Sequence, residues 1–230
     1  MQVRVGSMRA RVVQAVVLAA VLGGCGQHDD GAVKPSGSAS AERAEADSAA
    51  AASGGTIGTA GSACELPVSF DIAEHWKAKG IAAEKELSKA SKGSDGDLSG
   101  ALADSLLRQG PVTAACEIDA KPAGHIGFLR VWTGKARDAD ARSVLRQFVA
   151  AEDNVSKEKY RTVSTGGGLH AVEVEYLYTS KLLDETKKER ALAVATPGGP
   201  VVLHLGGMDT EEHEAMLPAY ELARRTLKAT

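Results

Sequence analysis

Hydrophobic and polar residues alternate along several stretches of the chain after residue 63, and this pattern predicts β-strands. The predicted strands cover residues 68–72, 116–119, 126–132, 160–164, 170–179, 190–195 and 201–205. Residues 126–132 carry apolar side chains on both faces, which indicates a central strand covered on both sides. Turn residues at 166–168 and 197–200 indicate that neighbouring strands form hairpins.

Apolar residues three and four positions apart predict four helices. Two of them cover residues 81–90 and 98–107, and leucines of the second recur at positions 98, 102 and 106. The third begins at an Asp138 cap, and its predicted buried residues are Ala141, Val144, Leu145, Phe148 and Val149. The fourth begins at an Asp209 cap, and its predicted inner face contains Met216, Tyr220, Ala223 and Leu227. Helices that bracket a run of strands predict an α+β domain with a mostly antiparallel sheet flanked by helices.

The first 24 residues have the pattern of an export signal. Three arginines precede an apolar run at 12–22, which is shorter than the roughly 20 residues that a membrane-spanning helix needs. Leu22-Gly23-Gly24-Cys25 follows and resembles the lipobox of bacterial lipoproteins. The resemblance implies that the Cys25 thiol receives a lipid and that the chain is cut before Cys25. The alternative is an ordinary secretory signal with an incidental cysteine.

The sequence predicts that the chain has three parts. We expect a signal peptide at 1–24, a lipidated Cys25 with a flexible tether to residue 62, and a single domain at 63–230. The tether is rich in Gly, Ala and Ser and has no aromatic residue, so it lacks the apolar surface that offsets ordering entropy. The expected location is the extracytoplasmic face of the cell membrane, with the lipid on Cys25 as the anchor.

Cys25 is assigned to the lipid, which leaves Cys64 and Cys116 as an even pair. Exported proteins fold under oxidising conditions, so we expect a Cys64–Cys116 disulfide. Two buried thiols and a metal pair are the alternatives, although no paired Cys or His spacing supports zinc.

Charge argues against nucleic acid as a partner. The whole chain has a formal net charge of −3, and without the three arginines of the signal it has 24 basic and 30 acidic residues. Nucleic-acid binding needs clustered Lys and Arg, and no basic stripe or aromatic platform occurs.

The order of the predicted elements is similar to the PsbP-like α/β/α sandwich, a fold shared by actinobacterial lipoproteins of the LpqN type. The likeness rests on Phe70-Asp71-Ile72 with Trp76, on the strand from Phe128 to Trp132 with the helix after it, and on the closing helix at 214–227. It covers about residues 64–228, and the insert at 78–110 departs from the simplest version of the fold. The resemblance implies a non-catalytic accessory or binding role and supplies no catalytic residues.

No hydrolase, metalloprotease or nucleotide-binding motif occurs in the chain, and we expect no cofactor and no metal site. Carboxylates at Glu117, Asp119, Glu173 and Glu175 would do acid–base chemistry if a pocket held them together, but a solvated sheet face explains them more simply. Gly166-Gly167-Gly168 leads into a strand and is interpreted as a turn instead of a phosphate loop. The histidines have no ligand spacing, and His204 is interpreted as a satisfied core residue.

Aromatic residues are the candidates for binding. Trp76, Trp132 and Tyr178 are possible contacts for a ligand or a protein partner, although a tryptophan is more often part of the core. Three functions remain open: a membrane-anchored binding or accessory domain, a carrier of an apolar small molecule or lipid, and a carboxylate-dependent envelope hydrolase. An enclosed apolar pocket would favour the carrier, and converging carboxylates would favour the hydrolase.

Overall fold

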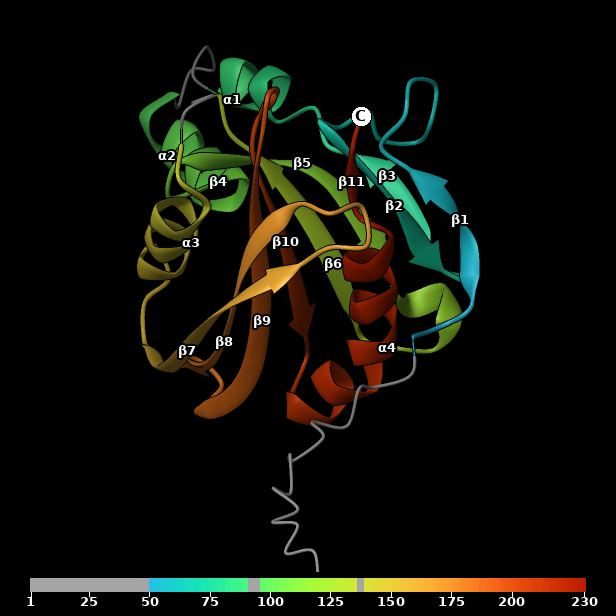
Figure 1. Ribbon diagram of the computed structural model, residues 1–230. Coiled ribbons are helices and arrows are strands. Elements are labelled where there is room, and N and C mark those ends of the chain that lie inside the picture. The colour runs from blue at the N-terminus through green and yellow to red at the C-terminus, as the bar shows by residue number, and fades with distance from the viewer. Residues whose placement is uncertain (1–49, 91–95, 136–138) are drawn as a thin grey trace, which may run out of the picture. The chain divides into compact units, whose positions relative to one another are not determined.

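Eight antiparallel strands form the main sheet of the computed structural model, which describes residues 50–90, 96–135 and 139–230 (Figure 1). The sheet order is β3 (Lys77–Gly80), β5 (Val112–Asp119), β6 (Gly127–Thr133), β10 (Gly199–Gly207), β9 (Glu185–Thr196), β8 (His170–Ser180) and β7 (Val155–Ser164), with β4 (Arg108–Gln109) paired to β5. A smaller sheet has the order β1 (Ser53–Ile57), β2 (Val68–Ala73) and β11 (Lys228–Ala229).

Helices cover the main sheet on both faces. Helix α3 (Ala141–Ala150) packs on one face, and α1 (Ala83–Ala90) and α2 (Gly96–Leu107) form a pair at its upper end (Figure 1). Helix α4 (Thr210–Thr226) and the smaller sheet pack on the other face, and a short 3₁₀ turn lies at Lys121–Ala123. The predicted α+β class with a mostly antiparallel sheet is therefore confirmed.

A β-bulge in β5 allows one strand to supply both hydrophobic cores. Val112 and Ala114 pack toward α3, and the register shifts between Ala114 and Cys116. After the shift, Cys116 and Ile118 point into the core under α4. A bulge adds one residue and so reverses the faces of the strand beyond it. The same reversal turns Glu117 toward the α3 face.

The tether expected at 25–62 is wrong in its last third. Residues 53–57 form β1, which pairs with β2, and Ile57 is buried in the core. Ala50 and Ala51 already pack against this core, and the Ala51 amide donates to the Pro218 carbonyl of α4 over 3.0 Å. Composition alone does not predict this strand, because its backbone hydrogen bonds to β2 stabilise it whatever its side chains are.

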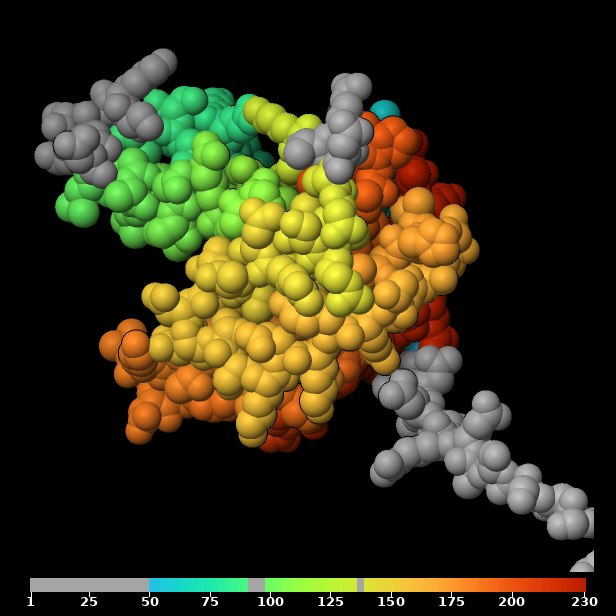
Figure 2. All heavy atoms as spheres, turned by 60° about the vertical axis from the view of Figure 1, so that its left-hand side comes forward, coloured from blue at the N-terminus to red at the C-terminus, as the bar shows by residue number. Residues whose placement is uncertain are grey.

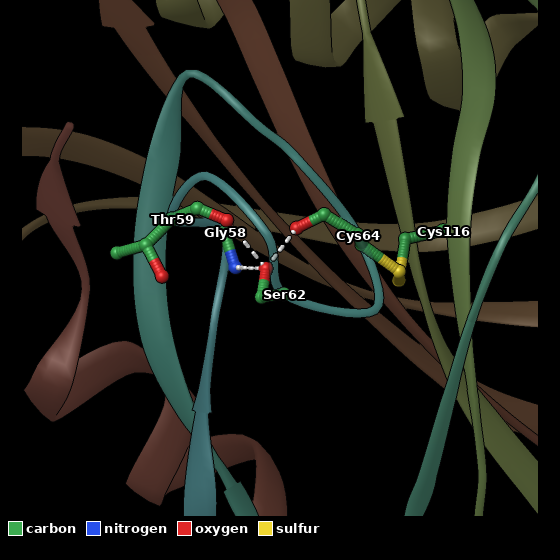
Figure 3. The surroundings of a disulfide bond; sticks show 5 residues. All are labelled: Gly58, Thr59, Ser62, Cys64 and Cys116. Atoms are coloured by element: carbon green, nitrogen blue, oxygen red, sulfur yellow. Dashed lines mark hydrogen bonds between the residues drawn. A yellow bond between two sulfur atoms is a disulfide. The ribbon is translucent and has the colours of Figure 1, made fainter.

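The disulfide between Cys64 and Cys116 is present and joins the smaller sheet to the main sheet (Figure 3). Its two Cα atoms are 5.9 Å apart, and both residues are buried. The loop before Cys64 is held by the Ser62 hydroxyl, which accepts from the Gly58 amide and lies 2.7 Å from the carbonyl oxygens of Thr59 and Cys64. The expected pairing is confirmed.

Two details of the predicted helices differ. The cap of α3 is Asp140, whose carboxylate accepts from the Ser143 amide over 2.8 Å, whereas the predicted cap Asp138 lies outside the described residues. The expected cap at Asp209 is confirmed by its bond from the Glu212 amide. Helix α2 forms where the leucine spacing predicts it, but Leu98, Leu102 and Leu106 are 78%, 60% and 61% exposed.

Candidate functional site

A row of charged and aromatic side chains crosses the α3 face of the main sheet, next to Phe148 of α3. Glu117 of β5, Arg130 of β6 and His204 of β10 are direct neighbours in the strand register. The Arg130 guanidinium is bonded to the Glu117 carboxylate and lies 4.4 Å from the centre of the Phe128 ring. It also lies 5.6 Å from the Trp132 ring, so Arg130 stands between two aromatic residues of its own strand. Glu189 and Lys187 continue this row. We call Glu117, Arg130, His204, Glu189 and Lys187 together the polar row.

His204 and Glu189 form the buried centre of the polar row. The His204 Nε2 lies 2.6 Å from Glu189 Oε2 and 3.3 Å from the hydroxyl of Tyr176. Lys187 approaches the same carboxylate from the other side at 2.8 Å and donates to the Gly207 carbonyl. One carboxylate is thus shared by two cationic partners.

Neighbouring charges oppose the effect of burial on the pKa values at this centre. Burial alone would lower the pKa of His204, but the charge and hydrogen bond of Glu189 outweigh it and raise that pKa. Burial would likewise raise the pKa of Glu189, yet His204 and Lys187 lower it on balance. Burial, followed by the Glu152 and Glu189 carboxylates, holds the pKa of Tyr176 well above its usual value. The opposite shifts of the two pKa values favour the imidazolium–carboxylate form of this pair.

A hollow of about 290 Å³ opens beside the polar row, at the ends of β5, β6 and β10. Ile126, Phe128 and Met208 form its apolar wall, and Glu117, Asp119 and Lys121 form a charged wall. Gly206 forms part of its floor, where a Cβ would lie 2.9 Å from the Phe128 ring. Glycine is needed at this position because the ring lies directly over the backbone of the neighbouring strand.

A second ionic network lies on the opposite face, between the sheet and α4. The buried Glu173 carboxylate accepts from the Tyr220 hydroxyl over 2.9 Å and from the Arg161 side chain over 2.8 Å. Arg190 is bonded to Glu175 over 2.7 Å, which lowers the pKa of that carboxyl. The solvated face expected for Glu173 and Glu175 is therefore wrong for Glu173, because α4 covers it.

The chain matches the protein family described as "Uncharacterised lipoprotein" over residues 34–227. The match includes the whole of the described α+β fold up to the end of α4 and part of the chain before it. This lipoprotein belongs to that family.

Other comparisons add little to the family match. The solution structure of cyanobacterial PsbP (CyanoP) from Synechocystis sp. PCC 6803 is similar to this lipoprotein, with a TM-score of 0.43 and 12% identity over 76% of this chain and 98% of that chain. This level of similarity supports no conclusion about fold or function. Curated proteins gave no match. None of the described helices of this lipoprotein has the length and apolar character needed to cross a bilayer.

The four carboxylates considered for a hydrolase do not meet. Glu117 and Asp119 lie on β5 and point toward the α3 face, whereas Glu173 and Glu175 lie on β8 and point toward the α4 face. Strands β6, β10 and β9 separate them, a distance of about 19 Å at the usual strand spacing. The converging carboxylates that a hydrolase would need are therefore not formed by these four residues.

The expected binding residues divide into core and surface. Trp76 and Trp132 are buried, and Trp132 packs edge-to-face on Phe148 with ring centres 5.5 Å apart. They are not surface anchors. Tyr178 is half-buried, with the Lys187 ammonium 5.6 Å from its ring, and lies next to the polar row. Cys25 lies outside the described residues.

Two further expectations are resolved by the structure. His204 is a satisfied core residue, as expected. The Gly166-Gly167-Gly168 segment is a hairpin turn. Its first two glycines are needed because the turn packs on the end of α4, where a Cβ on Gly166 would lie 1.5 Å from the Arg225 carbonyl oxygen.

Sequence reasoning missed Arg130 and Glu189. The signal for Arg130 was present, because Phe128, Arg130 and Trp132 occupy alternate positions of one predicted strand and so share a face. Glu189 gave no such signal. It follows the exposed polar residues at the start of β9 and is buried only by contact with its partners.

Proposed function

We propose that a lipid on Cys25 holds this lipoprotein on the extracytoplasmic face of the cell membrane, where its domain has a non-catalytic binding or accessory role. Membership of a lipoprotein family and the lipobox-like Leu22-Gly23-Gly24-Cys25 support the anchor. The observation that carries the binding role is the hollow beside Arg130 and Phe128.

The geometry of the polar row favours binding over catalysis. A general base needs an accessible lone pair near a bound substrate. Glu189 is instead buried and shared by His204 and Lys187, and the Glu117 carboxylate is occupied by Arg130. Groups that neutralise one another in this way stiffen a surface and leave it with little net charge.

The hollow suits a single side chain of a partner protein. Its volume of about 290 Å³ is at the lower limit of small-molecule sites, and it combines an apolar wall with a charged one. Arg and aromatic residues are the groups that most often dominate protein interfaces, and Arg130 and Phe128 supply both at the edge of the hollow.

The anchor is tested by a Cys25→Ser variant expressed in the cells of origin. We expect that the variant is released to the medium or remains uncleaved, and that it takes up no labelled palmitate. Recovery of the variant in the membrane fraction at the mature size would contradict the anchor.

The binding role is tested with a photo-reactive residue at Lys121, on the charged wall of the hollow. We expect it to cross-link to an envelope protein in intact cells, and expect Phe128→Ala to abolish the product. The matched control is Tyr160→Ala, which removes another aromatic ring that lies under an arginine, Arg146, at 5.7 Å but away from the hollow. Equal cross-linking in both variants, or none in the unchanged protein, would refute a partner at this site.

A further inference from the structure

Exposed large hydrophobic residues of the described chain fall into two groups. One is the leucine stripe of α2. The other comprises Ile126, Leu182, Leu183 and Met208, which are 48%, 92%, 67% and 54% exposed. These four residues lie in the β5–β6, β8–β9 and β10–α4 connections. Because neighbouring strands are antiparallel in the order β5-β6-β10-β9-β8, all three connections lie at one end of the sheet. We call this end the apolar end.

Backbone contacts join two of these connections and place β9 beside the start of α4. The Met208 amide donates to the Ile126 carbonyl over 2.9 Å, and the Lys188 amide donates to the Thr210 hydroxyl at the start of α4 over 3.1 Å. Leu183 lies five residues before Lys188, so the β8–β9 turn extends about 15 Å past the end of β10. Two consecutive leucines therefore stand at the tip of a projecting hairpin.

The described chain begins, at residue 50, in the same half of the domain. The Ala51 amide is bonded to the Pro218 carbonyl in α4, and α4 begins at the apolar end. Figure 1 shows the start of α4, the β8–β9 turn and the beginning of the described chain in the lower part of the molecule. Helix α2 and the C-terminus lie in the upper part. Figure 2 shows the α1–α2 pair projecting from the upper part as well.

We infer that the Leu182–Leu183 tip of the apolar end docks on the lipid surface that holds Cys25 and enters the acyl boundary, which leaves Ile126 and Met208 to the hollow. This inference rests on the proposed anchor. A bilayer is the occupant that the proposed anchor favours, because the described chain that follows Cys25 begins in the same half of the domain as this tip. Lys181 precedes the two leucines and Asp184 follows them, so the tip has no excess of positive charge. Docking is therefore driven by apolar burial and is independent of anionic lipid.

The test places a tryptophan at the tip. The mature lipidated protein with Leu182→Trp is reconstituted in phosphatidylcholine vesicles that contain brominated phosphatidylcholine, with and without phosphatidylglycerol. The matched control is Leu102→Trp in the α2 stripe, which is also exposed but at the other end. Both native tryptophans are buried and so stay out of contact with lipid. Because Leu182 is almost fully exposed, its replacement leaves the packing of the domain unchanged.

We expect a blue shift and loss of most of the added emission for Leu182→Trp, equal in both lipid mixtures, and no quenching for Leu102→Trp. Absence of quenching at position 182 would overturn docking, as would quenching at position 102 alone. A blue shift that depends on protein concentration and not on brominated lipid would instead identify a second copy as the occupant. Intact mass reports the lipid on Cys25 separately, so failure of the anchor and failure of docking give different results.

Discussion

His213 and His204 are both buried, yet their pKa values move in opposite directions. His204 has a carboxylate partner, and its pKa is raised. Burial dominates at His213 and lowers its pKa from 6.5 to about 4, and its Nδ1 has no hydrogen-bond partner within the described chain. The stability contributed by the His204 pair is present below pH 6.5 and is lost as the pH rises through the folded-state pKa. The contribution of neutral His213 is present above pH 6.5 and is lost as the pH falls toward 4.

His213→Leu is expected to flatten the acid side of the stability profile. Between pH 7 and pH 4.5 the wild-type protein should lose about 2 kcal/mol more than the variant, because unfolding lets His213 bind a proton. Urea denaturation at both pH values measures the difference. His170→Leu, at an exposed position, should keep the wild-type slope. Equal slopes in the wild type and His213→Leu would show that His213 is protonated in the folded protein.

Glu189→Gln is expected to lower the free energy of unfolding by about 3 kcal/mol at pH 6, because it leaves His204 and Lys187 without their shared carboxylate. The loss should shrink above the pKa of His204, where the ring is neutral in the wild type. Glu175→Gln, which removes a more exposed partner of Arg190, should cost less at every pH. A loss that grows with pH would contradict the imidazolium–carboxylate pair.

At the scale of elements, close backbone contacts fix the position of the turn between β7 and β8 against α4. The Gly166 and Gly167 amides donate to the Arg224 and Leu227 carbonyls, so the turn caps the end of α4. This contact fixes one corner of the sheet against the closing helix. It also explains Gly166 and Gly167, whereas Gly168 is favoured by its positive φ of +78°.

Gly166→Ala is expected to destabilise the domain by at least about 2 kcal/mol, because its Cβ would lie 1.5 Å from the Arg225 carbonyl oxygen and must displace the turn. Gly168→Ala in the same turn meets no atom within 4 Å and has only its φ of +78° to strain it, so it should cost about 1 kcal/mol. Thermal denaturation of both variants tests the ranking. The reverse ranking would show that backbone strain outweighs the contact with α4.

At the scale of the whole molecule, the smaller sheet and the main sheet are joined by packing and by one covalent bond. Cys64 precedes β2, and Cys116 lies within β5, so the bond closes a loop over 52 residues that contains β2, β3, α1 and α2. Closing a loop of this length lowers the conformational entropy of the unfolded chain. The disulfide also fixes the smaller sheet over the core that α4 shares.

The double variant Cys64→Ala/Cys116→Ala is expected to lose about 4 kcal/mol of unfolding free energy through the larger entropy of its unfolded chain. Denaturant titration of the variant, compared with wild type with and without reductant, measures this loss. Ser62→Ala, which weakens the same loop but keeps the bond, should cost about 1 kcal/mol. If reductant left wild-type stability unchanged, the disulfide would have no stabilising role.

The sequence by itself determined the local features of this lipoprotein. Alternation located β2, β6, β8, β9 and β10, spacing located α3 and α4, and cysteine parity paired Cys64 with Cys116, because each of these signals is carried by neighbouring residues or by simple counting. Only the tertiary structure decided what depends on distant segments. Backbone pairing recruited residues 53–57 into a strand, the bulge in β5 put Glu117 on the α3 face, and α4 buried Glu173. The polar row exists for the same reason: Glu117, Arg130, His204 and Glu189 come from four strands, and only their register brings opposite charges together.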